Sequence, residues 1–250
     1  MKKILVTGGL GYIGSHISIS LLQKGYEVTL IDSLINSNLE TFEKIKNIVK
    51  IESPEFENKI EFAMGDIRDP KFLEIVFKKA RYTKNYDAVM HFAAHTDVSE
   101  SVMKPMKFYI NNVGDSLHLM EAICLEDDKR KGNQKNRIPI IFSSSCATYG
   151  KPLKLPIEED HPQFPINPYG RSKLIIEQII KDLWITKKLP SVIFRYFNAA
   201  GADLSGRMGE KHNPETHLIP LALKAALDKK KSLNLYGIDY PTYDGTCIRD

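Results

Sequence analysis

A tyrosine and a lysine four residues apart, Tyr169 and Lys173, are the pair in this chain best suited to chemistry. Residues at positions i and i+4 share one face of a helix, so the lysine charge can act on the tyrosine ring. A nearby cation favours phenolate over phenol, and a phenol that titrates near neutrality can take a proton from an alcohol or sugar hydroxyl. The spacing therefore predicts a general base at Tyr169 with a lowered pKa, although a single Tyr-x-x-x-Lys match is also common on exposed helices.

Ser145 is the third candidate for catalysis, because it follows an apolar run that is predicted to be a strand. A serine hydroxyl donates and accepts at once, which suits a short proton relay between a substrate hydroxyl and a phenolate. No Gly-x-Ser-x-Gly sequence surrounds it, so a covalent nucleophile is disfavoured. Ser143 and Ser144 are predicted to be closer to ordinary loop serines, and Cys146 is predicted to be a packing residue.

A glycine-rich turn at residues 8–14 lies between an apolar run and a segment with helical spacing. Gly8, Gly11 and Gly14 fit the open variant of the dinucleotide fingerprint, and Gly9 fits the tighter one. Glycines let backbone amides approach a pyrophosphate, which a helix N-terminus stabilises through its dipole. A glycine-rich segment of this kind is sometimes only a tight turn. Its place directly after a predicted strand, however, predicts a dinucleotide site.

Asp32 ends the second predicted strand, about 20 residues beyond the glycine turn, where an acidic residue binds the adenosine ribose hydroxyls in dinucleotide sites. A carboxylate at this position would repel a 2′-phosphate. Asp32 therefore favours NAD over NADP, and the alternative is that it caps the following loop.

The rest of the pattern predicts strands that alternate with helices. The predicted strands are residues 4–7, 27–31, 60–64, 86–92, 138–142, 191–195 and 233–236. The predicted helices are residues 15–24, 39–50, 70–81, 106–125, 169–186 and 218–227. This alternation indicates an α/β fold, a Rossmann-type doubly wound parallel sheet with helices on both faces. We expect an NAD-binding domain at residues 1–196 and the start of a smaller, substrate-covering domain at residues 197–250.

Polar and small residues stand where the predicted strands end. Ligands of open α/β sheets bind at the carboxyl ends of the strands. The residues at these ends are Gly8, Asp32, Asp66, Ala93, Ser145 and Asn198. We therefore expect one crevice to hold all the candidate site residues.

Composition excludes several other classes of protein. The 250 residues are 42% hydrophobic and 26% charged, with a formal net charge of +4, which is typical of a globular protein. Much of the basic excess lies at residues 126–137, a run without aromatic residues that is predicted to be a solvated surface loop and not a nucleic-acid interface. No apolar run is long enough to span a membrane, and no signal peptide precedes the first strand.

The cysteines and histidines give no sign of a metal site. Three scattered cysteines fit neither a zinc cluster nor a disulfide framework, so a reducing cytoplasm is expected. His91, His95 and His118 lie in or beside apolar segments and are predicted to be core or crevice residues. We expect no catalytic metal.

Five segments together resemble the extended short-chain dehydrogenase/reductase family. They are residues 7–14, 91–94, 142–145, 169–173 and 195–198. Two later segments, residues 199–220 and 236–250, narrow the resemblance to the nucleotide-sugar 4-epimerases of that family. The resemblance covers essentially the whole chain.

The resemblance implies an isomerase that interconverts UDP-galactose and UDP-glucose through a 4-keto sugar, with a tightly held NAD and no net redox change. Tyr169 would be the base, with Lys173 and Ser145 assisting it. The alternatives are a 4-epimerase for UDP-glucuronate or UDP-pentoses, a 4,6-dehydratase, or a non-catalytic NAD-binding relative. Cys146 and Ala147 stand where a dehydratase carries an Asp-Glu pair, which disfavours that reading.

The resemblance also assigns residues to the two ligands. The cofactor would contact Gly8, Gly11, Tyr12, Ile13, Gly14, Asp32, Asn36, Ser37, Asp66, Ile67, Phe92, Ala93, Ala94, Asn112, Ser143, Tyr169, Lys173, Tyr196 and Phe197. The UDP-sugar would contact Ser145, Tyr169, Asn198, His217, Leu218, Tyr236 and Arg249.

Two features of the assembled enzyme follow from the resemblance as expectations. The helices at residues 106–125 and 169–186 resemble those that form a four-helix interface in family homodimers. Relatives continue beyond Asp250 by about 90 residues, the size of a second lobe, so we expect the substrate domain of this chain to be incomplete. Whether N-acetylated UDP-sugars are accepted is left open.

Overall fold

The computed structural model describes residues 1–130, 137–212, 215–228, 230–235 and 237–247. The chain divides into two compact units, unit 1 at Met1–Tyr196 and unit 2 at Phe197–Asp250. Each unit is described by itself below.

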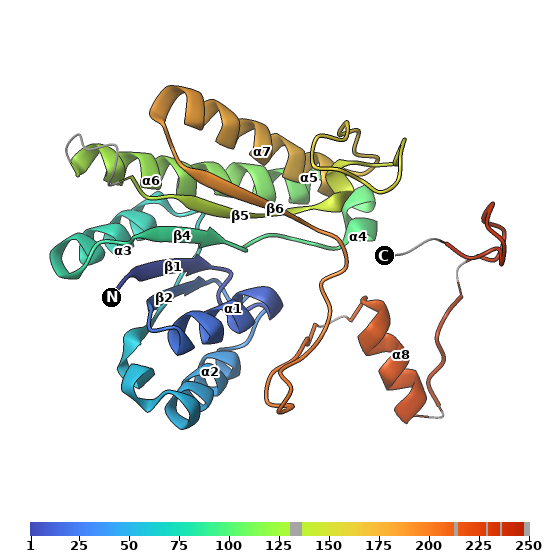
Figure 1. Cartoon of the computed structure of the whole chain (residues 1–250), viewed down its shortest axis with the longest axis horizontal. Helices are drawn as coiled ribbons and strands as arrows, with labels where there is room; N and C mark the ends of the chain where they lie inside the picture. The colour runs from blue at the N-terminus through green and yellow to red at the C-terminus, as the bar shows by residue number, and fades with distance from the viewer. Residues whose placement is uncertain (131–136, 213–214, 229, 236, 248–250) are drawn as a thin grey trace. The chain divides into compact units, whose positions relative to one another are not determined.

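Unit 1 contains a six-stranded parallel sheet with the order β3-β2-β1-β4-β5-β6 (Figure 1). Its strands are β1 (Lys3–Thr7), β2 (Glu27–Asp32), β3 (Ile60–Met64), β4 (Ala88–His91), β5 (Ile140–Ser145) and β6 (Ser191–Tyr196). The central strands form from short apolar runs because both of their faces are covered, so each residue of β1 is buried. The strand order reverses between β1 and β4, and the predicted doubly wound fold is confirmed.

Helices cover both faces of the sheet, as predicted. They are α1 (Tyr12–Gln23), α2 (Leu39–Glu52), α3 (Pro70–Thr83), α4 (Val98–Met103), α5 (Pro105–Phe108), α6 (Ser116–Lys129), α7 (Pro168–Lys187) and, in unit 2, α8 (Leu218–Leu227). Short turns of other types are η1 (Pro54–Lys59), η2 (Tyr109–Asp115) and η4 (Cys146–Thr148). Helices α1 and α2 lie on one face, and α3, α6 and α7 lie on the other (Figure 1). None of the described helices is both long and apolar enough to cross a membrane.

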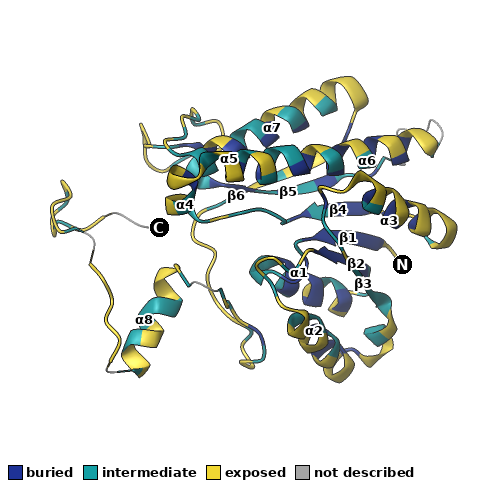
Figure 2. Ribbon diagram, turned by 180° about the vertical axis from the view of Figure 1, so that it is seen from behind, coloured by how far each residue is buried: buried dark blue, intermediate teal, exposed yellow. Residues whose placement is uncertain are grey.

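The main core lies between the sheet and the layer of α3, α6 and α7. Leu5, Phe142, Leu119 and Ile176 are among its buried side chains, contributed by two strands and two helices. The burial colours of Figure 2 show these helices buried toward the sheet and exposed on the opposite side. This core holds the strand ends rigidly enough to position a site at the carboxyl edge.

The predicted helix at residues 106–125 is interrupted. Pro105 begins the short helix α5, since proline is favoured in the first turn, and a π-helical segment, η2, then precedes α6. A π segment widens the helix by one residue per turn and often lies at a functional site. It places the neighbouring residues Asn111 and Asn112 side by side against the segment after β4, a geometry that helical periodicity does not reveal.

Two other predictions were wrong. The basic run at residues 126–137 is not wholly a solvated loop, because α6 continues to Lys129 and buries Glu126 and Asp127. Arg81 of α3 pairs with Glu126, and the distance from Arg81 Nη2 to Glu126 Oε2 is 2.6 Å. The rest of the run, residues 131–136, lies outside the described residues. Residues 233–235 are not a strand, because an apolar run becomes one only beside a strand edge, and within the described chain they pair with none.

Candidate active site

The site lies along the edge of the sheet that the carboxyl ends of the six parallel strands form. Helix α7 begins at Pro168, and the N-cap Asn167 accepts a hydrogen bond from the Gly170 amide at 2.8 Å. Ser145 is the last residue of β5, and its hydroxyl accepts a hydrogen bond from the Ala147 amide at 3.1 Å. These two local caps fix the backbone on either side of Tyr169 and Ser145.

Gly170 brings α7 close to the turn after β5. A Cβ atom at this position would lie 2.4 Å from the carbonyl oxygen of Ala147, so only glycine fits without a backbone shift. The close approach brings the Ser145 hydroxyl near enough to the Tyr169 phenol to favour the ionised form of that phenol. The structure therefore brings two of the three predicted catalytic residues together.

Lys173 is buried beside this pair, with 3% of its surface exposed. Its Nζ atom donates a hydrogen bond to the carbonyl oxygen of Ser143 at 2.7 Å and lies 5.9 Å from the centre of the Tyr169 ring. Burial lowers the pKa of Lys173 to about 7, and the Glu177 carboxylate opposes this effect. The ammonium group is thus held at the site in a state that titrates near neutrality.

The predicted lowering of the Tyr169 pKa is wrong for this structure. Burial raises the pKa of the phenol, and the hydrogen bond with Ser145 only partly offsets that rise. The Lys173 ammonium binds a backbone carbonyl and not the phenol oxygen, so desolvation outweighs its attraction. In this arrangement Tyr169 rests as a phenol.

Asp32 links the glycine turn to the loop after β2. Its Oδ2 atom accepts a hydrogen bond from the Leu10 amide at 3.0 Å. Its Oδ1 atom accepts from the Leu34 amide at 2.9 Å and from the Ser37 hydroxyl at 2.6 Å. The carboxylate is only 8% exposed, so it does cap the loop, as the alternative reading of the sequence held, while it also lies beside the glycine turn.

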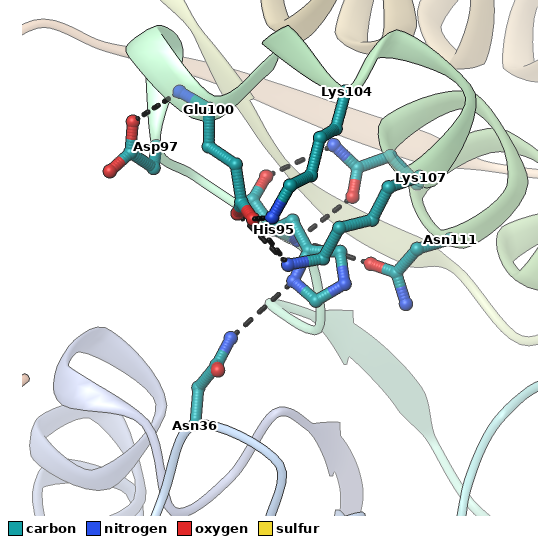
Figure 3. Close-up of polar contacts among 8 residues, drawn as sticks. Asn36, His95, Asp97, Glu100, Lys104, Lys107 and Asn111 are labelled. Carbon is teal, nitrogen blue, oxygen red and sulfur yellow. Dashed lines mark hydrogen bonds and ion pairs between the residues drawn. The ribbon is translucent and has the colours of Figure 1, made fainter. Parts of the chain in front are cut away.

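The segment after β4 meets the loop after β2 at His95 (Figure 3). Its Nδ1 atom is 3.4 Å from Asn36 Nδ2, and its backbone amide donates to the side-chain oxygens of Asn111 and Asn112 at 3.1 and 2.8 Å. Burial, with a smaller contribution from the Lys107 charge, lowers the pKa of His95. His95 is thus a crevice residue, as predicted.

Asn112 is fully buried, and its carboxamide is engaged within the protein. Its Nδ2 atom donates to the carbonyl oxygen of His95 at 3.0 Å and to the hydroxyl of Ser172 at 3.1 Å. Ser172 lies between Tyr169 and Lys173 on α7. Asn112 therefore connects the segment after β4 to the helix that carries both candidate catalytic residues.

A buried chain of hydrogen bonds runs from the backbone of Asn112 to β4 and β1. The Ser116 hydroxyl donates to the carbonyl oxygen of Asn112, so it must accept from His91 Nε2, at 2.8 Å. His91 Nδ1 then accepts from the Thr7 hydroxyl at 2.7 Å. Burial lowers the pKa of His91 to about 3, which keeps the ring neutral. His91 is a satisfied core residue, as predicted.

The other predicted cofactor residues of unit 1 lie along the same edge. Tyr12 and Ile13 open α1, Asp66 and Ile67 follow β3, Phe92, Ala93 and Ala94 follow β4, and Tyr196 ends β6. Asp66 accepts a hydrogen bond from the Arg68 amide at 3.0 Å and pairs with its guanidinium group. The sheet thus gathers residues that are up to 188 positions apart, from Gly8 to Tyr196, at one edge.

Comparison with known proteins identifies the family. A family model described as GDP-mannose 4,6 dehydratase matches residues 5–250. The chain is 47% identical to the UDP-glucose 4-epimerase of Rhizobium meliloti (strain 1021), over 100% of this chain and 67% of that protein. The chain belongs to the UDP-glucose 4-epimerase family.

Solved structures of family members share this fold. One, UDP-glucose 4-epimerase from Brucella ovis in complex with NAD, is 42% identical with a TM-score of 0.83 and covers 99% of this chain and 67% of that one. Another, from Bifidobacterium longum in complex with NAD+ and UDP, is 38% identical with a TM-score of 0.88 and covers 100% and 69%. The chain thus spans about two thirds of the length of these family members, and the resemblance seen in its motifs is confirmed.

Unit 2 carries the residues that the family resemblance assigns to UDP. Phe197 and Asn198 follow β6 and are exposed, and Leu218 is the exposed first residue of α8. His217 precedes it as the N-cap residue. Tyr236 and Arg249 lie outside the described residues.

His217 lies in a cluster that the sequence did not indicate, with Glu210, His212 and Glu215. Its ring contacts the Glu210 carboxylate, and Glu215 accepts the backbone amides of His212, Thr216 and His217. These contacts engage both carboxylates, and they stabilise the turn that precedes α8.

Sequence reasoning missed a buried carboxylate of unit 1 that has several hydrogen-bond partners. The buried carboxylate of Glu177 binds Arg195, Ser144 and Gln163. The prediction that Ser144 is close to an ordinary loop serine was wrong, because Ser144 is a buried residue of β5. The partners of Glu177 lie 14, 18 and 33 positions away from it in sequence. The spacing of residues 169, 173 and 177 could nevertheless have indicated a third functional group on the same helix face.

Proposed function

We propose that this protein interconverts UDP-galactose and UDP-glucose by NAD-dependent 4-epimerisation. The observation that carries the proposal is the placement of Tyr169 near Ser145 with buried Lys173 beside them, at the edge of a sheet shared with UDP-glucose 4-epimerases. Family members of known structure are described with NAD and with UDP, which supports these two ligands for this chain.

The residues of unit 1 fit NAD at the glycine turn. Gly11 is the N-cap residue of α1 and has no side chain to occupy the first amides of the helix, which suits a pyrophosphate. Gly8 has φ +66°, and a Cβ atom there would lie 2.6 Å from the Ala93 nitrogen, so the turn packs closely on the segment after β4. Asp32 favours ribose hydroxyls over a 2′-phosphate at the end of β2.

The other cofactor residues that we propose lie beyond this turn. Asn36, Ser37, Asp66 and Ile67 would border the adenosine, while Phe92, Ala93, Ala94, Ser143, Tyr196 and Phe197 would border the nicotinamide half. Asn112 would act through His95 and Ser172, because its carboxamide already binds both. When bound, NAD supplies a hydride acceptor that returns the hydride within the same turnover.

The protein's own residues would move the proton. Tyr169 accepts the proton of the sugar 4-hydroxyl, directly or through Ser145, and returns it when the sugar is reduced again. Since burial raises the Tyr169 pKa, its ionisation requires positive charge at the site, and Lys173 is the buried cation that can provide it. Ser145 can donate to the phenolate while it accepts from the substrate.

The substrate's UDP group would supply most of the binding energy, because the 4-keto sugar must turn over within the site. We propose that Asn198, His217, Leu218, Tyr236 and Arg249 contribute to UDP binding. The reaction would take place in the cytoplasm, which agrees with the free thiols of Cys124, Cys146 and Cys247.

We also propose that the protein is a homodimer. Met106, Ile110 and Leu117 on the α5 to α6 segment, and Trp184 and Ile185 on α7, are exposed apolar side chains on neighbouring helices. The same two helices from a second copy would cover them in a four-helix bundle. Sedimentation of the protein as a monomer at micromolar concentration would contradict this.

The test uses the protein expressed from its complete gene. Conversion of UDP-galactose to UDP-glucose is measured without added NAD, in the natural protein and in Tyr169→Phe. Removal of the phenol hydroxyl should lower kcat by about 100-fold or more, the usual contribution of general acid–base catalysis. Tyr82→Phe, at an exposed tyrosine of α3, is the matched control and should leave kcat unchanged.

Each outcome decides one part of the proposal. Conversion that is lost only in Tyr169→Phe supports both the reaction and the role of the base. Bound NAD without conversion of UDP-galactose would overturn the substrate, and UDP-glucuronate and UDP-pentoses would be tested next. Equal activity in Tyr169→Phe and the natural protein would overturn the role of Tyr169.

A further inference from the structure

Glu177 is a carboxylate of α7 with 0% of its surface exposed, and the proposed chemistry leaves it unused. It lies one helical turn after Lys173, which lies one turn after Tyr169, so the three side chains follow one face of the helix. A buried charge is costly unless it is paired and hydrogen-bonded. Its position beside the candidate catalytic residues therefore needs an explanation.

Donors from three other segments surround this carboxylate. Arg195 of β6 forms a forked pair with it, with distances of 2.8 and 3.2 Å to Oε2 and 3.1 Å to Oε1. Ser144 of β5 donates to Oε1 at 2.5 Å, and Gln163 donates to Oε2 at 3.0 Å. These donors outweigh burial and hold the pKa of Glu177 below its usual range, so the group is ionised.

The donors belong to the segments that carry the site. Ser144 stands between Ser143, whose carbonyl oxygen accepts from Lys173, and Ser145, whose hydroxyl acts on the pKa of Tyr169. Arg195 immediately precedes Tyr196 at the end of β6. Glu177 thus joins the ends of two strands to the helix that carries the candidate base.

Glu177 is also the anion that acts on Lys173. Burial lowers the pKa of Lys173, and the Glu177 charge is the one that opposes this lowering. Other titratable groups lie on the elements packed against this region. Burial lowers the pKa of His91 of β4, Asp115 of η2 accepts a hydrogen bond from Asn111, and Glu100 of α4 pairs with Lys104 and Lys107. The Tyr149 hydroxyl, next to η4, accepts a hydrogen bond from Arg195, and Cys146 and Tyr169 lie nearby.

We infer that Glu177 is a positioning residue for catalysis, which with Arg195 fixes the ends of β5 and β6 and supplies a counter-charge that favours the ammonium form of Lys173. The same carboxylate thereby sets both the geometry and the charge of the site. The inference rests on the proposed function for the role of Lys173 in the reaction. The role of Glu177 in fixing the ends of β5 and β6 does not depend on the proposed function.

The test measures the titration of Lys173 itself. In protein labelled with carbon-13 at lysine Cε, the Lys173 resonance is assigned by its loss in Lys173→Met and followed against pH. Glu177→Gln should move its midpoint to lower pH by about one unit, as loss of an adjacent opposite charge does. Arg195→Gln removes a neighbouring cation and should move the midpoint in the opposite direction.

Glu126→Gln is the matched control. Glu126 is a buried carboxylate of α6, and Arg81 of α3 is its forked partner. It does not lie beside Lys173. The control should share any general loss of stability that follows from breaking a buried ion pair, and it should leave the Lys173 midpoint unchanged. If Glu177→Gln does not fold, the upward shift in Arg195→Gln carries the test.

The pH profile of epimerisation gives the second measurement. The alkaline limb of kcat should move to lower pH in Glu177→Gln together with the Lys173 midpoint, and it should stay in place in Glu126→Gln. An unshifted Lys173 midpoint in Glu177→Gln or in Arg195→Gln overturns the inference. Absence of UDP-galactose conversion in the natural protein overturns the proposed function instead, and the resonance titration still decides the role of Glu177.

Discussion

The two units of this chain differ in how much of their own surface they bury. Unit 1 packs a continuous core between the sheet and helices α3, α6 and α7, including Leu5, Leu119 and Phe142. In the described part of unit 2, helix α8 has no buried residue, and Met208 is the one buried hydrophobic side chain. The proposed cofactor and catalytic residues therefore stand on a scaffold that is stabilised by its own core, whereas the proposed UDP residues do not.

This contrast has a functional meaning if the proposed roles are correct. Burial of apolar surface contributes about 25 cal/mol per Å², so unit 1 has its own source of rigidity. A local structure with few buried contacts opens at low free energy. In a protein of these 250 residues, the NAD site should accordingly be more stable than the UDP site.

A matched pair of leucine truncations gives the largest expected effect. Leu119→Ala in α6 removes a fully buried side chain and should cost about 3 kcal/mol of unfolding free energy. Leu223→Ala in α8, where the side chain is 58% exposed, should cost less than about 0.5 kcal/mol. Urea denaturation followed by circular dichroism measures both, and comparable costs would remove the contrast between the units.

A pair of glycine substitutions should give a smaller difference. Gly170→Ala places a Cβ atom 2.4 Å from the Ala147 carbonyl oxygen and should cost about 1–3 kcal/mol, with loss of the Tyr169 contact to Ser145. Gly209→Ala in unit 2 meets only the Ala202 side chain, at 3.4 Å, and should change stability by less than about 0.5 kcal/mol. Thermal unfolding of the two variants checks this, and a larger loss in Gly209→Ala would show that unit 2 is the more tightly packed.

The smallest expected effect is a local pH dependence at the turn before α8 in unit 2. Burial acts to raise the pKa of Glu215, but hydrogen bonds from the His217, His212 and Thr216 amides outweigh it and hold that pKa below its usual range. The stabilisation is therefore present above the ordinary glutamate pKa and is lost as the pH falls through the lowered one. Amide chemical shifts of residues 215–217 should change on acidification while those of β1 do not, and Glu215→Gln should abolish the change. Equal acid sensitivity in β1 would contradict it.

Local sequence patterns predicted most of the helices and strands. The strand at residues 60–64 and the helix at residues 218–227 have the predicted bounds, because apolar periodicity and turn residues are local signals. The Tyr169 to Lys173 spacing and the glycine turn also lie within single elements. Their convergence at one edge followed from the parallel topology alone.

The errors arose where distant residues decide the outcome. Glu126 looks like part of a solvated charge run until Arg81, 45 positions away, pairs with it. The Tyr169 pKa depends on burial and on which acceptor Lys173 reaches, neither of which is a property of helical spacing. Residues 233–235 have the composition of a strand, but pairing needs a partner edge that sequence does not specify.

Asp32 couples two properties that are usually discussed apart. A carboxylate offers about four acceptor sites, and three of those on Asp32 already bind Leu10, Leu34 and Ser37. Exchange of Asp32 for a neutral side chain, the obvious way to admit a phosphorylated ribose, would also leave these three donors without their acceptor. Engineering of cofactor preference in this protein would therefore have to rebuild the glycine turn at the same time, because selectivity and local folding depend on one side chain.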